Sequence, residues 1–264
     1  MRASSAVAAT GVGLGVLEDL ANRQDFSDSG LMSYRIAELI WDTPRWRWVA
    51  HMQTRLYDFE SFLVVTALRA VAATVLLATA LFSPRARVEA AACAVLLAGA
   101  AYGLERSPYG ADGADQMSVI IFAGLTAAWA FPARSEGRLA ALLFIAGQLT
   151  LSYVVAGVAK SVSRSWWNGT GLASVLATRN YGSMGLAKLS REHRWMAIAT
   201  SAGVILFETT FVAAWFLPRP YVAAYLAAGI GFHLGVAFTM GLNTFVCPFL
   251  AAYPIAWYCM TSRL

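Results

Sequence analysis

The chain carries little charge, and most of that charge has one sign. Asp, Glu, Lys and Arg make up 13% of its 264 residues, whereas a soluble domain carries about 25%. Hydrophobic residues make up 58%, so the composition excludes an ordinary soluble protein and is typical of one built from membrane spans. The net charge of +5 comes from 18 arginines against only two lysines. The arginines are scattered and form no basic stripe, which argues against nucleic-acid binding and favours contacts with lipid headgroups.

Cysteine and histidine are also scarce, with three of each. Cys93, Cys247 and Cys259 lie in apolar runs without CxxC spacing, so we interpret them as small buried hydrophobes. The histidines are far apart and show neither HxxE nor HxxxH spacing, so no metal site is predicted. The sequence also has no Ser-His-Asp arrangement, P-loop or GxGxxG motif, which removes the common hydrolase and nucleotide-binding signatures.

What the sequence has in abundance is long apolar runs of about 20 residues, the length that spans a bilayer. We predict eight spans, at 4–21, 61–83, 88–104, 117–133, 139–161, 195–217, 221–242 and 243–261. The fold class is therefore all-α, a polytopic integral membrane helix bundle forming a single domain over 1–264. The first run also resembles a signal peptide, but Glu18 and Asp19 at its far end favour a span. Pro248 and Pro254 are expected to interrupt the last run.

Two connections between the runs are long, residues 22–60 and 162–194. Trp41, Trp46 and Trp48 alternate with arginines in the first, which favours a helix lying at the membrane interface over a plain surface loop. The short turns 83–88 and 134–138 are rich in arginine and are placed in the cytoplasm by the positive-inside rule. With eight spans, both termini are then cytoplasmic in a multi-pass plasma (bacterial inner) membrane protein, and the two long connections are extracytoplasmic.

Ionisable residues inside spans cost roughly 2.5–3.5 kcal/mol each at the centre and mark sites or internal pairs. Those that stand out are Arg69, Lys160, Glu208, His233 and the pair Asp112 and Asp115. In the predicted orientation most fall in the outer half, as a single polar cavity open to the outside requires.

Each of these residues also has a purely structural interpretation. Lys160 can extend its ammonium to the interface, and Arg69 can pair with Glu208. His233 can be a core histidine bonded to a backbone carbonyl. Asp112 and Asp115 can cap the fourth span.

Lys160 has a chemical interpretation as well. A lysine surrounded by apolar walls loses its proton more readily and can act as a base. Tyr153 lies seven residues earlier on the same helix face, and Gly157 between them is expected to leave room for a ligand. Trp166 and Trp167 follow directly, either as interface anchors or as the mouth of the site.

At these residues the chain resembles the horizontally transferred transmembrane family, which includes the vitamin K-dependent gamma-glutamyl carboxylase. Four stretches carry the resemblance: "LEDLANRQDFSDSG" (17–30), "ERSPYGADGADQMSVIIFAGLTAAW" (105–129), "QLTLSYVVAGVAKSVSRSWWNGTGL" (148–172) and "FHLGVAFTMGLNTFVCPFLAAYPIAW" (232–257). The third is the most specific, with its Gln, Tyr, Ala-Gly-x-x-Lys, Trp and Gly.

The resemblance implies an enzyme with a reduced, vitamin K-type quinone as cofactor. Lys160 is then the base that deprotonates the quinol, with oxygen and carbon dioxide as further reactants and a small peptide as substrate. Asp115 and His233 assist or orient, and Arg69 stabilises charge. The implied cofactor-binding residues are Gln148, Tyr153, Gly157, Trp166 and Trp167.

Two departures from the carboxylase limit what carries over. The family histidine at the start of the span 117–133 is missing, and Asp115 or Gln116 stands nearest in "DGADQMS". The carboxylase's large soluble C-terminal part is also missing from this sequence. Small relatives resemble the sporulation-delaying-protein B group, which implies the alternative of a non-catalytic membrane factor for peptide-toxin maturation or export. A third hypothesis is a scaffold in which the polar groups are structural pairs.

Overall fold

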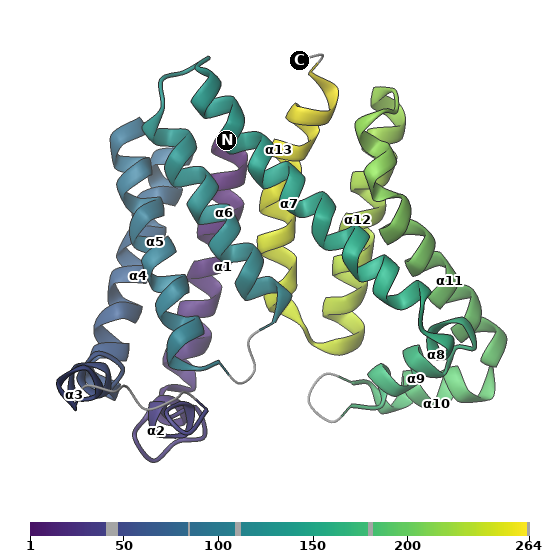
Figure 1. Cartoon of the computed structure of the whole chain (residues 1–264), viewed down its shortest axis with the longest axis horizontal. Coiled ribbons are helices and arrows are strands. Elements are labelled where there is room, and N and C mark those ends of the chain that lie inside the picture. Colours follow the sequence, from purple (N-terminus) through teal and green to yellow (C-terminus); the bar gives the residue numbers. More distant parts are fainter. Residues whose placement is uncertain (41–46, 84, 109–111, 179–181, 263–264) are drawn as a thin grey trace. The chain divides into compact units, whose positions relative to one another are not determined.

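The computed structural model describes residues 1–264 except 41–46, 84, 109–111, 179–181 and 263–264. Its described residues form helices and no strand, as the fold class predicted. Long helices lie at all eight predicted spans: α1 (Arg2–Ala21), α4 (Phe59–Leu81), α5 (Ala86–Arg106), α6 (Gly113–Ala130), α7 (Glu136–Ser161), α11 (Arg194–Thr210) with η2 (Phe211–Trp215), α12 (Arg219–Met240), and α13 (Val246–Thr261) after η3 (Asn243–Phe245) (Figure 1). Trp41 and Trp46 lie outside the described residues.

Among the described helices, six are long and apolar enough to cross a membrane: α4, α5, α7, α11 with η2, α12, and η3 with α13. The chain is therefore a multi-pass helical protein of the membrane type. Helices α1 and α6 are not among these six, and each carries acidic residues near one end, Glu18 and Asp19 in α1 and Asp115 in α6. The count of eight spans stays a prediction, as does the orientation of the termini.

The surface of α4 has the pattern of a helix in contact with lipid. Val64, Leu68 and Val71 follow one another at helical spacing and are 54–63% exposed. Exposed apolar side chains on one stripe would be costly in water, whereas hydrocarbon tails surround them at no cost. The buried stripe of the same helix carries small residues such as Ala72 and Ala73. These features support contact with a lipid bilayer.

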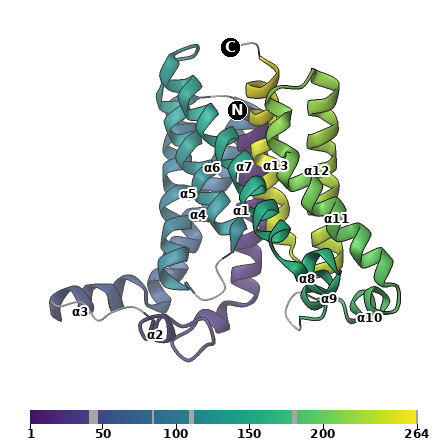
Figure 2. The ribbon, with the colours of Figure 1, turned by 45° about the vertical axis from the view of Figure 1, so that its right-hand side comes forward.

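The chain divides into two compact units, Met1–Ala141 and Leu142–Leu264, which are described separately. In unit 1, α1 packs against α4, α4 against α5, and α5 against α6 (Figure 2). In unit 2, α12 packs against α13, and α11 leads through η2 into α12. The prediction of a single domain over 1–264 stays a prediction.

In its described residues the first long connection holds the 3-10 helix η1 (Arg23–Phe26) and two short α-helices, α2 (Tyr34–Ala37) and α3 (Arg47–Leu56). Both lie at the end of unit 1 opposite the first residues of α1 (Figures 1 and 2). Helix α3 exposes Trp48, Met52 and Leu56, which are spaced four residues apart and so share one face. Such a face next to the start of α4 is typical of a helix at a membrane surface, and that location stays a prediction.

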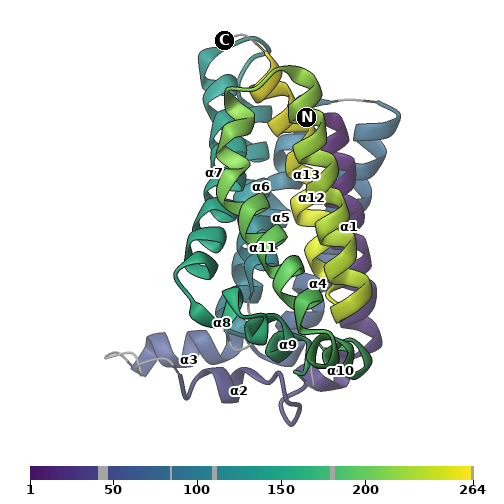
Figure 3. The same ribbon diagram turned by 90° about the vertical axis from the view of Figure 1, so that its right-hand side faces the viewer.

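The second long connection folds into α8 (Arg164–Trp167), α9 (Thr170–Leu176) and α10 (Met184–Glu192). These helices pack on one another and on α11, at the end of unit 2 opposite the turn between η2 and α12 (Figure 3). The expected interruption of the last span is wrong, because α13 is one continuous helix. Pro248 lies in its first turn, where no helical partner is lost, and the helix continues through Pro254.

Candidate functional site

Lys160 and Glu208 form a partly buried ion pair in unit 2. Nζ of Lys160, near the end of α7, donates to Oε2 of Glu208 on α11 at 2.7 Å and to Oε1 at 2.9 Å. The carboxylate is almost fully buried, with 3% of the side chain exposed, and the lysine side chain is 20% exposed. A buried carboxylate is retained only when it is paired, and this ammonium supplies the pairing.

The ammonium of Lys160 also faces the ring of Trp166. Nζ of Lys160 lies 5.3 Å from the ring centroid of Trp166 in α8, a distance at which the ring attracts a cation. The indole N–H of Trp167 donates to the carbonyl of Ser161 at 2.6 Å, while half of Trp167 stays exposed. The two tryptophans therefore fix α8 over the end of α7, and Trp166 forms one wall beside the pair.

Gly157 does not leave room for a ligand, contrary to the sequence prediction. A Cβ built on Gly157 would lie 2.6 Å from the backbone nitrogen of Thr209 and 2.9 Å from Cβ of Glu208. The missing side chain is therefore what allows α7 and α11 to approach closely, as small residues do between membrane helices. Glu208 therefore lies beside Gly157, which is about one turn before Lys160 on α7. This position allows the ion pair to form.

Gly157→Ala is expected to lower the free energy of unfolding by about 1–3 kcal/mol, because the added methyl meets backbone that cannot move aside. The matched control is Gly147→Ala in the same helix, where nothing lies within 4 Å. There alanine is expected to leave stability unchanged or raise it by up to about 1 kcal/mol. Unfolding of both variants in mild detergent checks the difference, and equal effects at the two positions would contradict the close-approach interpretation.

A second group of polar contacts joins three helices of unit 2. The hydroxyl of Tyr153 on α7 is hydrogen-bonded to Nε2 of His233 on α12 at 2.8 Å and to the hydroxyl of Tyr253 on α13 at 2.5 Å. All three side chains are buried. The interpretation of His233 as a residue bonded to a backbone carbonyl is therefore wrong, since its partner is a phenol. Its Nδ1 has no hydrogen-bond partner within the described residues.

Aromatic rings enclose this chain of hydrogen bonds. The ring of His233 stacks on Phe249 with centroids 4.3 Å apart, and Tyr153 contacts Phe207 and Phe211. Gly229 faces the hydroxyl of Tyr253 so closely that a side chain there would overlap it. Tyr153 and His233 are thus packed inside the unit, and neither presents a surface to a ligand. Gln148 lies half-buried on α7 and takes no part in the contacts described for either group.

The other predicted polar residues belong to unit 1. The Arg69 guanidinium donates to Oδ2 of Asp19 at 2.9 Å, joining α4 to α1. The alternative pairing of Arg69 with Glu208 is therefore wrong, because each residue has a different partner within its own unit. Gly99 on α5 leaves space for the Arg69 side chain, since a Cβ there would lie 2.6 Å from Cγ of Arg69.

Gly99→Ala is expected to displace the Arg69 side chain and to weaken its bond to Asp19. The loss of stability should shrink when Asp19 is already asparagine, because neighbours in one network are not additive. Gly103→Ala is the matched control on the same helix, with nothing within 4 Å of the added methyl. A double-mutant cycle measured by thermal unfolding checks this, and strict additivity would show that Gly99 and the ion pair are unrelated.

Asp112 and Asp115 form a capping box at the start of α6. The carboxylate of Asp112 accepts from the backbone nitrogens of Ala114 and Asp115, and that of Asp115 accepts from the nitrogen of Asp112. This is the capping interpretation, and it accounts for both carboxylates without a substrate. Asp115 lies in unit 1 and Lys160 in unit 2, so its catalytic role stays a prediction.

Sequence reasoning missed two buried charged residues. Arg106, at the end of α5, is 2% exposed and donates to the carbonyls of Met32 and Phe26 at 2.9 and 2.6 Å. Its guanidinium also lies over the rings of Phe26 and Phe62. Glu89, in the first turn of α5, is completely buried. Both stand at ends of an apolar run, where the sequence favours contact with headgroups.

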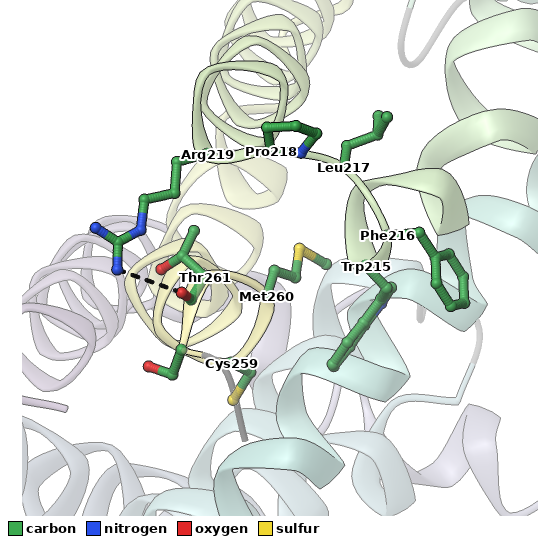
Figure 4. Close-up of a pocket in the computed structure, with 9 residues that line it drawn as sticks. Trp215, Phe216, Leu217, Pro218, Arg219, Cys259, Met260 and Thr261 are labelled. Atoms are coloured by element: carbon green, nitrogen blue, oxygen red, sulfur yellow. Dashed lines mark hydrogen bonds between the residues drawn. The ribbon is translucent and has the colours of Figure 1, made fainter.

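Unit 2 also has a surface hollow of about 1040 Å³. Its walls come from the turn Trp215–Arg219 and from the end of α13, residues 259–262 (Figure 4). Nη2 of Arg219 donates to the carbonyl of Thr261 across it at 3.5 Å. None of the predicted site residues lines this hollow. Among the described residues there is also no group of three or more His, Cys, Asp or Glu side chains placed to hold a metal ion.

Comparison with known proteins gives no relative: no protein-family model, no curated protein and no solved structure matches the chain.

Proposed function

We propose that this protein is a membrane-embedded enzyme that does acid–base chemistry on an apolar, quinol-type cofactor drawn from the bilayer, with Lys160 as the base. The observation that carries the proposal is the contact between Lys160 and the buried carboxylate of Glu208. Ionisable groups within membrane helices are costly and mark functional sites by default. The resemblance to the horizontally transferred transmembrane family points to the same lysine.

The residues around Lys160 fit an aromatic ring on one side only. A ring can lie against Trp166 and the exposed face of Trp167, since both offer flat apolar surface at the ammonium. A ring cannot lie at Gly157, where Thr209 fills the space, or at Tyr153, which other aromatic side chains enclose. A reduced quinone, when bound, supplies an acidic hydroxyl and two reducing electrons.

Lys160 must lose a proton before it can accept one. Oε2 of Glu208, 2.7 Å from Nζ, is positioned to take that proton. The centroid of the Trp166 ring lies 5.3 Å from Nζ of Lys160, so a ligand that contacts this ring is held close to the amine. In this arrangement Nζ of Lys160 accepts the substrate proton, Glu208 holds the displaced one, and Trp166 controls access to both.

A second candidate is a non-catalytic membrane factor for maturation or export of a small peptide. The observation that favours it is how fully Lys160 is engaged. Its ammonium contacts both carboxylate oxygens of Glu208, the carbonyl of Ala156 at 3.4 Å and the ring of Trp166. A lysine held in this way also serves as a structural connection between α7, α11 and α8.

Purification in mild detergent followed by mass spectrometry separates the two candidates. The enzyme hypothesis expects co-purified quinone in the wild type, and oxygen-dependent oxidation of added quinol that is lost in Lys160→Arg, because arginine cannot act as a base. The matched control is Lys188→Arg, which alters an exposed lysine paired with Glu192 on α10. Quinol oxidation that survives in folded Lys160→Arg would reject the lysine base. Absence of quinone from folded wild-type protein, with no quinol oxidation, would favour the peptide factor.

A further inference from the structure

Glu89 is a buried carboxyl group without a partner. It lies in the first turn of α5 and faces the interior of unit 1 together with Cys93 and Leu96, one and two turns further along. The residue has no exposed surface, and within the described residues neither carboxylate oxygen has a hydrogen-bond partner. An ionised carboxylate left in this state costs several kcal/mol. The buried carboxylate of Glu208 differs in having a lysine at 2.7 Å.

The nearest cationic side chains are bound to other groups. Arg2 on α1 donates from Nε and Nη2 to the carbonyls of Ala80 and Leu81, at the end of α4. Arg138, in the first turn of α7, donates from Nε and Nη2 to the carbonyls of Ala128 and Phe131. Both arginines and the N-terminal amino group of Met1 act on Glu89 only through space, and none of them donates a hydrogen bond to it. No guanidinium therefore fixes the carboxyl group in its ionised form.

The two helices packed against α5, which are α4 and α6, contribute no further cationic partner for Glu89 among the described residues. On α4, Arg69 is bound to Asp19 toward the far end of α1, and on α6 the carboxylate of Asp115 belongs to the cap of the first turn. The buried residues of α5 that lie closest to Glu89 along the helix are Ala92 and Cys93. A neutral carboxyl group is the state that this environment accommodates.

The same end of unit 1 holds buried hydroxyl groups. Ser4 and Ser5 on α1 are both fully buried, and the hydroxyl of Ser4 has no hydrogen-bond partner within the described residues. Ser5 accepts from the indole of Trp129, in the last turn of α6. The bonds from Arg2 to the end of α4 place this part of α1 near the start of α5. Water lies close by, since Arg85 and Arg87 are exposed one turn or less before Glu89.

We propose that Glu89 is a proton-binding site that exchanges its proton with water at the N-terminal end of α5. It is independent of Lys160, Glu208 and the function proposed for them. The ligand is a proton, held on a carboxyl oxygen as a neutral acid. Such a group within a membrane helix is typical of proteins that couple their work to proton uptake or release.

Infrared spectroscopy of the full chain in detergent tests the proposal. At neutral pH the wild type is expected to show a C=O band of a protonated carboxyl group, which shifts in D₂O because the proton exchanges. Glu89→Gln should lose this band and keep the thermal unfolding midpoint of the wild type, since glutamine has the shape of the neutral acid. Glu208→Gln is the matched control and should keep the band.

Four results would overturn the proposal. Absence of the band at neutral pH means that Glu89 is ionised, and a band that persists in Glu89→Gln belongs to another group. A band that does not shift in D₂O means a proton that is locked in place. A lower unfolding midpoint of Glu89→Gln would independently show that the ionised form is held by Arg2 or Arg138. Dicyclohexylcarbodiimide adds a chemical check: the acid O–H adds across one C=N bond, the acyl group moves to nitrogen, and the adduct should form on Glu89.

Discussion

Lys160→Met is expected to lower the free energy of unfolding by about 3 kcal/mol. The substitution keeps the length and apolar stem of the side chain but leaves the carboxylate of Glu208, 3% exposed, without its cation. Removing one partner of a buried pair costs about 3–5 kcal/mol. We expect the lower end because the lysine side chain is itself 20% exposed, so the pair is not fully enclosed. Unfolding in mild detergent measures the loss.

The double variant Lys160→Met/Glu208→Met should recover most of this stability. Once both charges are replaced by apolar side chains of similar volume, no buried charge remains to be compensated. Lys188→Met is the matched control, because that lysine is 77% exposed and lies 3.8 Å from its partner Glu192; we expect little change there. If the double variant were as unstable as the single one, the loss would come from packing around α8 and not from an unpaired carboxylate.

The positions of the helices could be predicted from the sequence, because hydropathy and length alone define an apolar run. All eight predicted runs are helical, and the boundaries differ by only a few residues. The cap formed by Asp112 and Asp115 could also be predicted from the sequence, since a capping box involves only residues that are close together in the chain. The continuity of α13 through Pro254 could not be predicted from the sequence, because the effect of an internal proline depends on packing around the freed carbonyl.

The partners of the charged residues could not be predicted, because they depend on which helices are neighbours. Arg69 and Glu208 looked like a pair only because both are charged and both lie in apolar runs. In the structure Arg69 pairs with Asp19, and Glu208 pairs with Lys160. Tyr253 was missed for a similar reason: a tyrosine in an apolar run is ordinary, and only the packing of α13 against α12 brings it to Tyr153.

Replacing Arg106 by methionine is expected to destabilise unit 1 by about 2–6 kcal/mol. Its guanidinium is the donor for the carbonyls of Phe26 and Met32, and leaving each buried acceptor without a donor costs about 1–3 kcal/mol. The rings of Phe26 and Phe62 lose the cation that they face. Since both carbonyls belong to the segment between α1 and α2, this segment should detach before the helices unfold.

Hydrogen exchange measured by mass spectrometry distinguishes local detachment from global unfolding. In Arg106→Met, amides of residues 23–33 should exchange faster while those of α5 and α6 keep their protection. Arg106→Lys should behave almost like methionine, because an ammonium cannot both bridge two carbonyls and lie over the stacked rings of Phe26 and Phe62 as a planar guanidinium does. Arg23→Met, at an exposed arginine of the same segment, is the matched control and should leave the exchange unchanged. Rescue of the segment by lysine would mean that charge alone holds it, and that the planar geometry of Arg106 contributes nothing.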